Sequence, residues 1–207
     1  MSIHILPEYR LNQAIKGAKA IREARAKDRD RNRDDNGENR NVDETIGKLG
    51  EEGFYDFKNH SGNPDYSVHQ PSYDIDIPEF YTVVKSCRFG YEFQEFDKNR
   101  KNGASFLFAR KEIKHTFDIE DSFGNLVPEY IYPDDCRVAF MLVDEELVDE
   151  KFTGRYKTCG WCFMKEIRLF WDANNYPPYS PNLDWKRAVY LEDFQHLLNP
   201  LEDLMAL

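Results

Sequence analysis

The stretch YDIDIPEFYTVVKSC, residues 73–87, decides how the rest of this sequence is interpreted. Apolar and polar residues alternate in it with the period of a β-strand, and this pattern predicts strands over 73–77 and 80–86. In the first strand the alternation places Asp74 and Asp76 on one face, with aromatic and aliphatic side chains on the other. A hairpin of two short strands with an acidic face is therefore expected.

Lys85 lies on the second strand, where a hairpin would bring Asp74 or Asp76 beside it. Aspartate oxygens are good ligands for Mg²⁺, which polarises a phosphoryl oxygen and lowers the pKa of a bound water. A lysine at the same point can orient that water and offset the charge that develops on the phosphate. A solvated acidic strand with a cross-strand ion pair is the alternative without catalysis.

Other motifs surround this hairpin in a recognisable order: GKLGEEGFYDF before it, then GYEFQEFD, RVAFMLVD, CGWCFMKEI and AVYLEDF. With YDIDI and TVVKSC, this order resembles the PD-(D/E)XK nuclease superfamily, the fold of many type II restriction endonucleases and Holliday junction resolvases. More narrowly, it is similar to endonucleases encoded by tailed phages, with their GE helix, YD strand, VKSC strand and late GW strand. The resemblance covers residues 45–196 and implies a restriction-endonuclease-like α/β fold, a mixed central sheet flanked by helices.

The resemblance also implies a function and a role for each motif residue. It implies a Mg²⁺- or Mn²⁺-dependent endonuclease that hydrolyses DNA phosphodiester bonds. Asp74 would be the central metal-binding aspartate and Lys85 the catalytic lysine. Glu51 would be the helix carboxylate that helps to hold the metal, with Glu52 as its substitute, while Gln94 would touch the metal shell or the DNA backbone. The expected metal ligands are Asp74, Glu51, Asp76 and Glu52.

Position 83 departs from the superfamily pattern, because Val83 stands where Glu or Asp usually precedes the lysine by two residues. Three explanations remain open. A neighbouring element can supply the missing carboxylate, or Glu51, Asp74 and the backbone carbonyl of Val84 can surround one metal. Alternatively, catalysis is lost and the fold serves as a protein-binding or inhibitory module. The candidates for a relocated carboxylate are Asp76, Glu92 and Glu95.

The remaining periodicity predicts the other elements and the domain boundary. Residues 1–41 are expected to form a helical arm and a charged linker, and residues 42–207 the nuclease-like domain. Helices are predicted over 8–29, 43–58 and 164–174, followed by a short helical segment at the C-terminus. Strands are predicted over 104–110, 114–118, 137–143, 156–163 and 187–191. The run RVAFMLV at 137–143 is apolar throughout, which indicates a central strand covered on both faces.

Charge and composition limit the partners of this 207-residue chain. Its net charge is −10, but residues 1–40 hold ten Lys and Arg against seven Asp and Glu, which leaves −13 on the remainder. Lys and Arg side chains bind DNA with the help of counterion release, and an acidic body works against this binding. Any contact with DNA must therefore be local, and the basic arm could contribute to it. Cleavage of both DNA strands would need two active sites, so we expect a homodimer that is tethered by the arm.

The sequence contains no signal-like or membrane-spanning run. We therefore expect no membrane partner and a cytoplasmic location, in the host if the gene is phage-encoded.

Two further motifs have competing interpretations. CGWC at 159–162 has the spacing of a redox motif or half a zinc site, but it falls inside a predicted strand and matches the GW strand of the resemblance. Pro64-Asp65 is a second candidate for the metal-binding aspartate, although it lies farther from Lys85 in the sequence.

Overall fold

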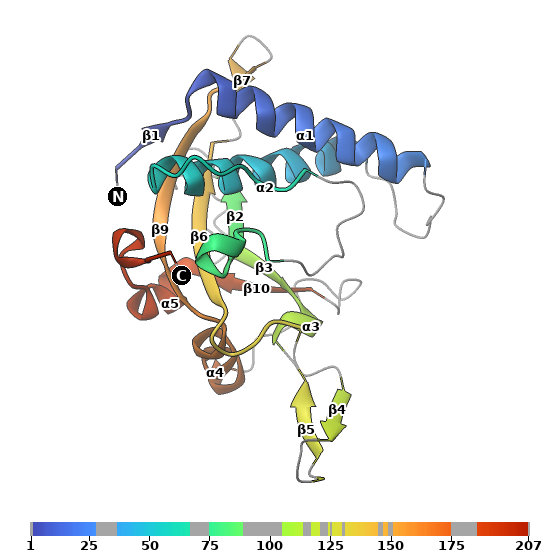
Figure 1. Ribbon diagram of the computed structural model, residues 1–207, viewed down its shortest axis with the longest axis vertical. Coiled ribbons are helices and arrows are strands. Elements are labelled where there is room, and N and C mark those ends of the chain that lie inside the picture. The colour runs from blue at the N-terminus through green and yellow to red at the C-terminus, as the bar shows by residue number, and fades with distance from the viewer. Residues whose placement is uncertain are drawn as a thin grey trace, which may run out of the picture.

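A computed structural model gives the arrangement of most of the chain (Figure 1). It describes residues 2–27, 37–66, 75–88, 105–113, 117–120, 124, 126–129, 131–144, 147–148, 151–174 and 186–206. The helices are α1 (Glu8–Lys27), α2 (Gly37–Phe57), α3 (Arg110–Ile113), α4 (Met164–Asn174) and α5 (Leu191–Phe194). The strands are β1 (His4–Ile5), β2 (Thr82–Arg88), β3 (Ser105–Ala109), β4 (Phe117–Glu120), β5 (Leu126–Glu129), β6 (Arg137–Val143), β7 (Leu147–Val148), β8 (Lys151–Phe152), β9 (Arg155–Phe163) and β10 (Lys186–Tyr190).

The centre of the fold is a mixed sheet, which within the described residues has four strands in the order β1-β9-β6-β2. β2 runs parallel to β6, with Thr82 opposite Arg137, whereas β9 runs antiparallel to β6 and to β1. The register between β6 and β9 shifts at Phe140 and Met141. Helices flank this sheet, so the chain has the mixed α/β architecture that the sequence predicts at this coarse level (Figure 1).

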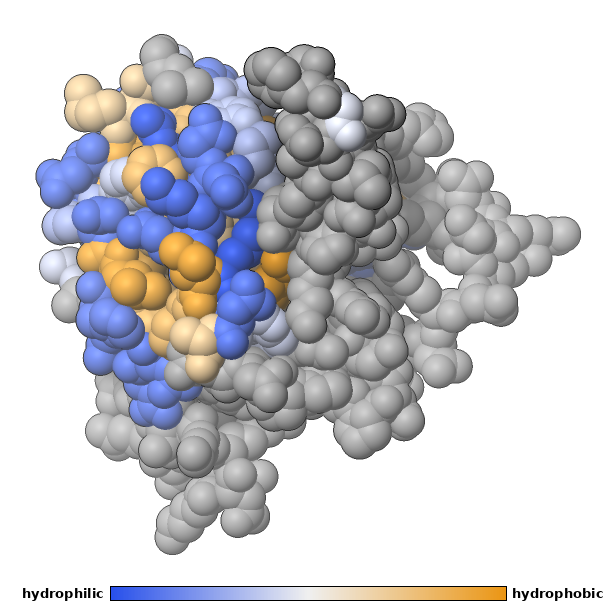
Figure 2. Space-filling model, turned by 90° about the horizontal axis from the view of Figure 1, so that it is seen from below, coloured by the Kyte–Doolittle hydropathy of each residue, from blue (hydrophilic) through white to orange (hydrophobic). Residues whose placement is uncertain are grey.

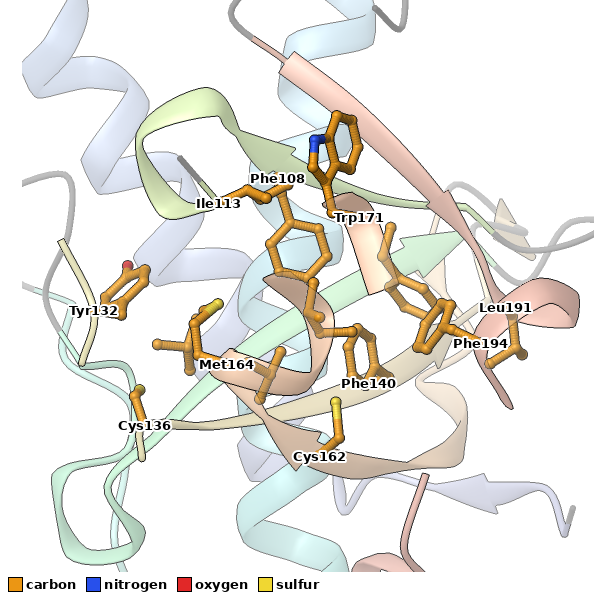
Figure 3. Close-up of a cluster of buried hydrophobic side chains, with 14 of the residues drawn as sticks. Phe108, Ile113, Tyr132, Cys136, Phe140, Cys162, Met164, Trp171, Leu191 and Phe194 are labelled. Atoms are coloured by element: carbon orange, nitrogen blue, oxygen red, sulfur yellow. The ribbon is translucent and has the colours of Figure 1, made fainter. Parts of the chain in front are cut away.

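Strand β6 confirms the prediction of a central strand that is covered on both faces. Its side chains alternate between two core clusters, Val138, Phe140 and Leu142 in the first and Ala139, Met141 and Val143 in the second. Figure 3 shows the first cluster, where the rings of Phe108, Phe140 and Phe194 meet from β3, β6 and α5. The second cluster lies on the opposite face, against α2 and the N-terminal segment.

The N-terminal helix α1 lies on α2, which in turn packs against the sheet (Figure 1). Helix α1 confirms the helix predicted over 8–29 within the described residues. Its buried Ala14 belongs to the same core cluster as Leu49 of α2. Helix α2 begins at Gly37, so the expected domain boundary at residue 41 falls inside it. The predicted arm thus contributes side chains to the core.

The predicted acidic hairpin is reduced, in its described part, to one bridge between Ile77 and Thr82. A 3-10 turn over Pro78–Phe80 separates these two residues, and Tyr81 closes the turn with a φ of 50°. Because proline cannot continue a paired strand, the chain turns here, and β2 begins at Thr82 rather than at residue 80 as predicted.

The C-terminal half follows the predicted order of elements. The strand predicted over 156–163 is β9, the helix predicted over 164–174 is α4, and the strand predicted over 187–191 is β10. The end of the described chain contains α5 and two 3-10 turns, Gln195–Leu197 and Leu201–Asp203, where one short helical segment was predicted.

Between β2 and β6 the structure differs from the predicted pair of strands. β3 ends at Ala109, and the next four residues form the helical turn α3 instead of extending the strand. β4 then occupies 117–120, three residues later than predicted, and pairs with β5 in a hairpin that extends away from the body (Figure 1). β3 itself pairs with β10, far along the chain.

Both hydrophilic and hydrophobic side chains reach the described surface. Figure 2 shows hydrophobic groups set among hydrophilic ones on the face seen from below. The exposed large apolar side chains include Ile5 at the sheet edge, Leu169 on α4 and Met205 near the C-terminus. Scattered apolar side chains of this kind are usual on protein surfaces. None of the described helices is long and apolar enough to cross a membrane.

Candidate functional site

The catalytic lysine predicted from the sequence, Lys85, lies in the middle of β2. Its ammonium lies 2.6 Å from a carboxylate oxygen of Glu112 and 5.0 Å from the centroid of the Phe108 ring. Val83, two residues earlier, is 1% exposed and packs in the first core cluster with Phe108. The position that usually carries a carboxylate is therefore part of the hydrophobic core.

Glu112, the partner of Lys85, is a buried carboxylate that the sequence did not reveal. It stands on α3, whose chain is fixed by Arg168 of α4: the guanidinium donates hydrogen bonds of 3.2 and 3.0 Å to the backbone carbonyl of Glu112. Glu112 belongs to the charged run RKEIKH, in which no periodicity distinguishes it from its neighbours. Only the helical turn after β3 brings it to Lys85.

Of the two aspartates that were predicted in the first strand, Asp76 lies within the described residues, next to β2. Its carboxylate accepts a 2.7 Å hydrogen bond from the backbone N–H of Val84. Burial raises the pKa of Asp76, and the negative charge of Glu112 adds to this rise. The Val84 N–H and the charges of Lys85 and Lys48 act in the opposite direction. Asp76 thus lies within the electrostatic range of Lys85 and Glu112.

Glu51 reaches the same region from α2. Lys48, one turn earlier on the helix, donates to both of its carboxylate oxygens, at 3.0 and 2.7 Å. Burial and the negative charge of Asp76 nevertheless raise the pKa of Glu51 to about 8, because they outweigh the effect of Lys48. Buried Glu51 and half-buried Asp76 therefore interact as two carboxyl groups whose negative charges repel each other.

Glu52 points away from this region and toward α1. It is fully buried, lies 2.6 Å from Arg10 and accepts a hydrogen bond from the Tyr66 hydroxyl. Arg10 also donates to the backbone carbonyls of His60 and Gly62. Of the two neighbouring glutamates, Glu51 interacts with Lys48 and Asp76, and Glu52 anchors α1 and the segment that follows α2.

The remaining predicted site residues divide into two groups. Asp74 and Gln94, together with the alternatives Glu92 and Glu95, lie outside the described residues. Asp65 of the Pro64-Asp65 pair is exposed, and its backbone carbonyl accepts a 3.0 Å hydrogen bond from Lys48. Among the described residues, no group of three or more His, Cys, Asp and Glu side chains is arranged to hold a metal ion.

The CGWC motif lies within β9, as the strand prediction requires. Cys162 is buried in the first core cluster, and Cys159 packs against the same cluster. Burial raises the pKa of Cys159 to about 12 and also raises the pKa of Cys162, so both thiols stay protonated at neutral pH. Protonated thiols are poor nucleophiles and poor metal ligands, which favours a packing role for both cysteines.

Comparisons with models of protein families, with curated proteins and with solved structures found no match to this chain.

Proposed function

We propose that this protein is a metal-dependent nuclease of the PD-(D/E)XK type that hydrolyses DNA phosphodiester bonds with Mg²⁺ or Mn²⁺. The observation that carries the proposal is the position of Asp76, whose carboxylate is bound to the N–H of Val84 next to Lys85 and interacts electrostatically with Lys85 and with Glu51 of α2. Two neighbouring carboxyl groups raise each other's pKa, because their negative charges repel. Carboxyl groups with raised pKa values are typical of functional sites.

The donor chemistry of this group fits a hard divalent cation. Carboxylate oxygens are the ligands that Mg²⁺ prefers, and the repulsion that raises the pKa of Glu51 would fall when a cation is shared. Asp76 and Glu51 would hold the cation, with Asp74 as the further predicted ligand. The bound cation would polarise a phosphoryl oxygen and activate a water. Lys85 would position that water, and Gln94 would support the arrangement.

A second candidate function is a nuclease-fold protein without catalysis, which would bind a protein partner. Three observations favour it: Val83 is a core residue, both oxygens of Glu51 are engaged by Lys48, and Lys85 is neutralised by Glu112. In addition, the described residues include no group arranged to hold a metal. In the nuclease, Lys48 would have to leave Glu51 when the cation binds.

DNA and a second copy of the chain are the partners that the nuclease proposal implies. The chain carries a net charge of −10, so binding would depend on local basic groups and would weaken steeply with salt. Cleavage of both strands needs two sites, which a homodimer would supply. Because α1 is docked on α2, its exposed side, which includes Lys19 and Glu23, is the proposed contact between copies.

The test is cleavage of plasmid and branched DNA by the purified chain with Mg²⁺ or Mn²⁺. We expect Asp76→Asn and Lys85→Met each to reduce the rate by about 100-fold or more, as the loss of groups that stabilise a charged transition state does elsewhere. Glu192→Gln, at an exposed position on α5, is the control and should cleave like the wild type. Cleavage that persists in Lys85→Met would place the activity elsewhere, and no cleavage with either metal would favour the binding module.

A further inference from the structure

The ion pair between Lys85 and Glu112 joins two elements that are distant in the sequence. The ammonium and carboxylate lie 2.6 Å apart, and the two side chains are only 17% and 6% exposed. Lys85 belongs to β2 and Glu112 to the single helical turn α3. An exposed ion pair contributes little, but one this shielded from water holds both groups in one geometry.

The backbone of Glu112 is held in place by α4. Arg168 of α4 is buried and donates two hydrogen bonds to the backbone carbonyl of Glu112. The same guanidinium lies 2.6 Å from a carboxylate oxygen of Asp134. α3 is therefore attached to α4 through its backbone, which leaves the side-chain carboxylate of Glu112 directed at Lys85 rather than at Arg168.

The lysine also has a second acidic neighbour. The positive charge of Lys85 and the negative charge of Glu112 both act on Asp76, whose carboxylate is fixed by the Val84 N–H. Lys85 thus contacts the carboxylate of Glu112 on α3 and interacts electrostatically with Asp76 of the proposed metal site. Val83, the neighbour on the same strand face, supplies only hydrophobic contact.

We propose that Glu112 is the acidic positioning residue of the lysine site: from α3 it holds the Lys85 ammonium on the side of β2 where Asp76 is bound. This role rests on the proposed nuclease function. Glu112 acts through Lys85 and does not itself contact the reacting phosphate. A fixed ammonium would be ready to orient the attacking water, whereas a mobile one would lose that advantage.

The test combines single-turnover DNA cleavage with chemical labelling of lysine amines, measured by peptide mass spectrometry. The variants are Glu112→Gln, which removes the charge, and Glu112→Asp, which keeps it. Glu166→Gln is the matched control, because the Glu166 carboxylate caps a backbone N–H at the start of α4 and does not pair with Lys85. Labelling of Lys48, whose partner is Glu51, serves as the internal control.

We expect Glu112→Gln to cleave about 100-fold more slowly, and its Lys85 to be labelled several-fold faster, while labelling of Lys48 stays constant. Glu112→Asp should restore cleavage to within about tenfold of the wild type, which a purely structural defect would not allow. If the wild type cleaves and Glu112→Gln loses no more activity than Glu166→Gln, the role of Glu112 is overturned and the nuclease proposal stands. If the wild type does not cleave DNA with either metal, both proposals fall.

Discussion

Gly50 of α2 packs directly against Ser86 of β2. A methyl group added at Gly50 would lie 1.8 Å from the Ser86 hydroxyl oxygen and 2.9 Å from its Cβ. A side chain larger than that of glycine at position 50 would therefore clash with Ser86, the residue that follows Lys85. This contact sets the depth at which α2 lies on the sheet, and Glu51, the next residue on the helix, depends on it to reach the region of Asp76.

Gly50→Ala should destabilise the protein, because the new methyl group has no space between the helix and the strand. Overpacking of this kind typically costs about 1–3 kcal/mol of unfolding free energy. Gly47→Ala on the same helix is the matched control, since a methyl group there would meet no atom within 4 Å. Because alanine favours helix over glycine, Gly47→Ala should stabilise by up to about 1 kcal/mol. Urea unfolding measures both, and equal effects of the two substitutions would contradict this packing.

Glu52→Gln should be strongly destabilising, because it leaves the buried Arg10 guanidinium without a carboxylate partner. Loss of one member of a buried ion pair costs about 3–5 kcal/mol. Glu23→Gln in the exposed Lys19–Glu23 pair is the control, and its effect should stay within about 0.5 kcal/mol. Thermal and urea unfolding provide the comparison. A cost at Glu52 as small as that at Glu23 would show that α1 is not anchored by this pair.

The raised pKa of Glu51 predicts a specific pH dependence of stability. Its carboxyl keeps a proton in the folded chain up to a pH of about 8, whereas the unfolded chain releases that proton near the ordinary value of 4.5. Stability from this group is therefore greatest below pH 4.5 and falls as the pH rises toward 8, by at most about 1.4 kcal/mol per pH unit. Above about 8 the contribution is constant.

Glu51→Gln tests this dependence, because glutamine keeps the shape of the side chain but cannot ionise. The difference in unfolding free energy between the wild type and this variant should fall from pH 5 to pH 8 in metal-free buffer. Glu192→Gln, at an exposed site, should give a flat difference over the same range. A flat difference for Glu51→Gln would mean that the carboxyl is ionised throughout and well compensated by Lys48.

Elements with a clear hydrophobic period could be predicted from the sequence. The continuous apolar run of β6 indicated burial on both faces, and α1 and α4 carry helical spacing that the structure confirms. The backbone conformation of the turn at residues 78–81 was harder to predict. Pro78 indicated the end of a strand, but no sequence pattern indicated the 3-10 turn or the left-handed conformation of Tyr81.

The candidate site was predictable only in part. Motif order pointed to Glu51 and Lys85, but helical periodicity could not say which of the neighbouring glutamates faces the strand. The answer depends on Arg10, which takes Glu52 and is far away in the sequence. Glu112 could not be found from the sequence, because its position depends on a long-range bond from Arg168 to its backbone.

The central claim, that Glu51 and Asp76 belong to a divalent metal site, is tested most directly by crystals soaked in Mn²⁺ at pH 8.5. This pH lies above the raised pKa of Glu51, about 8, and metal binding requires deprotonated ligands. The account predicts an anomalous density peak in contact with carboxylate oxygens of Asp76 and Glu51, with Lys48 displaced from Glu51. The same peak should be missing in Asp76→Asn crystals. Wild-type crystals that show no peak at these two carboxylates, with Lys48 still bound to Glu51, would contradict it.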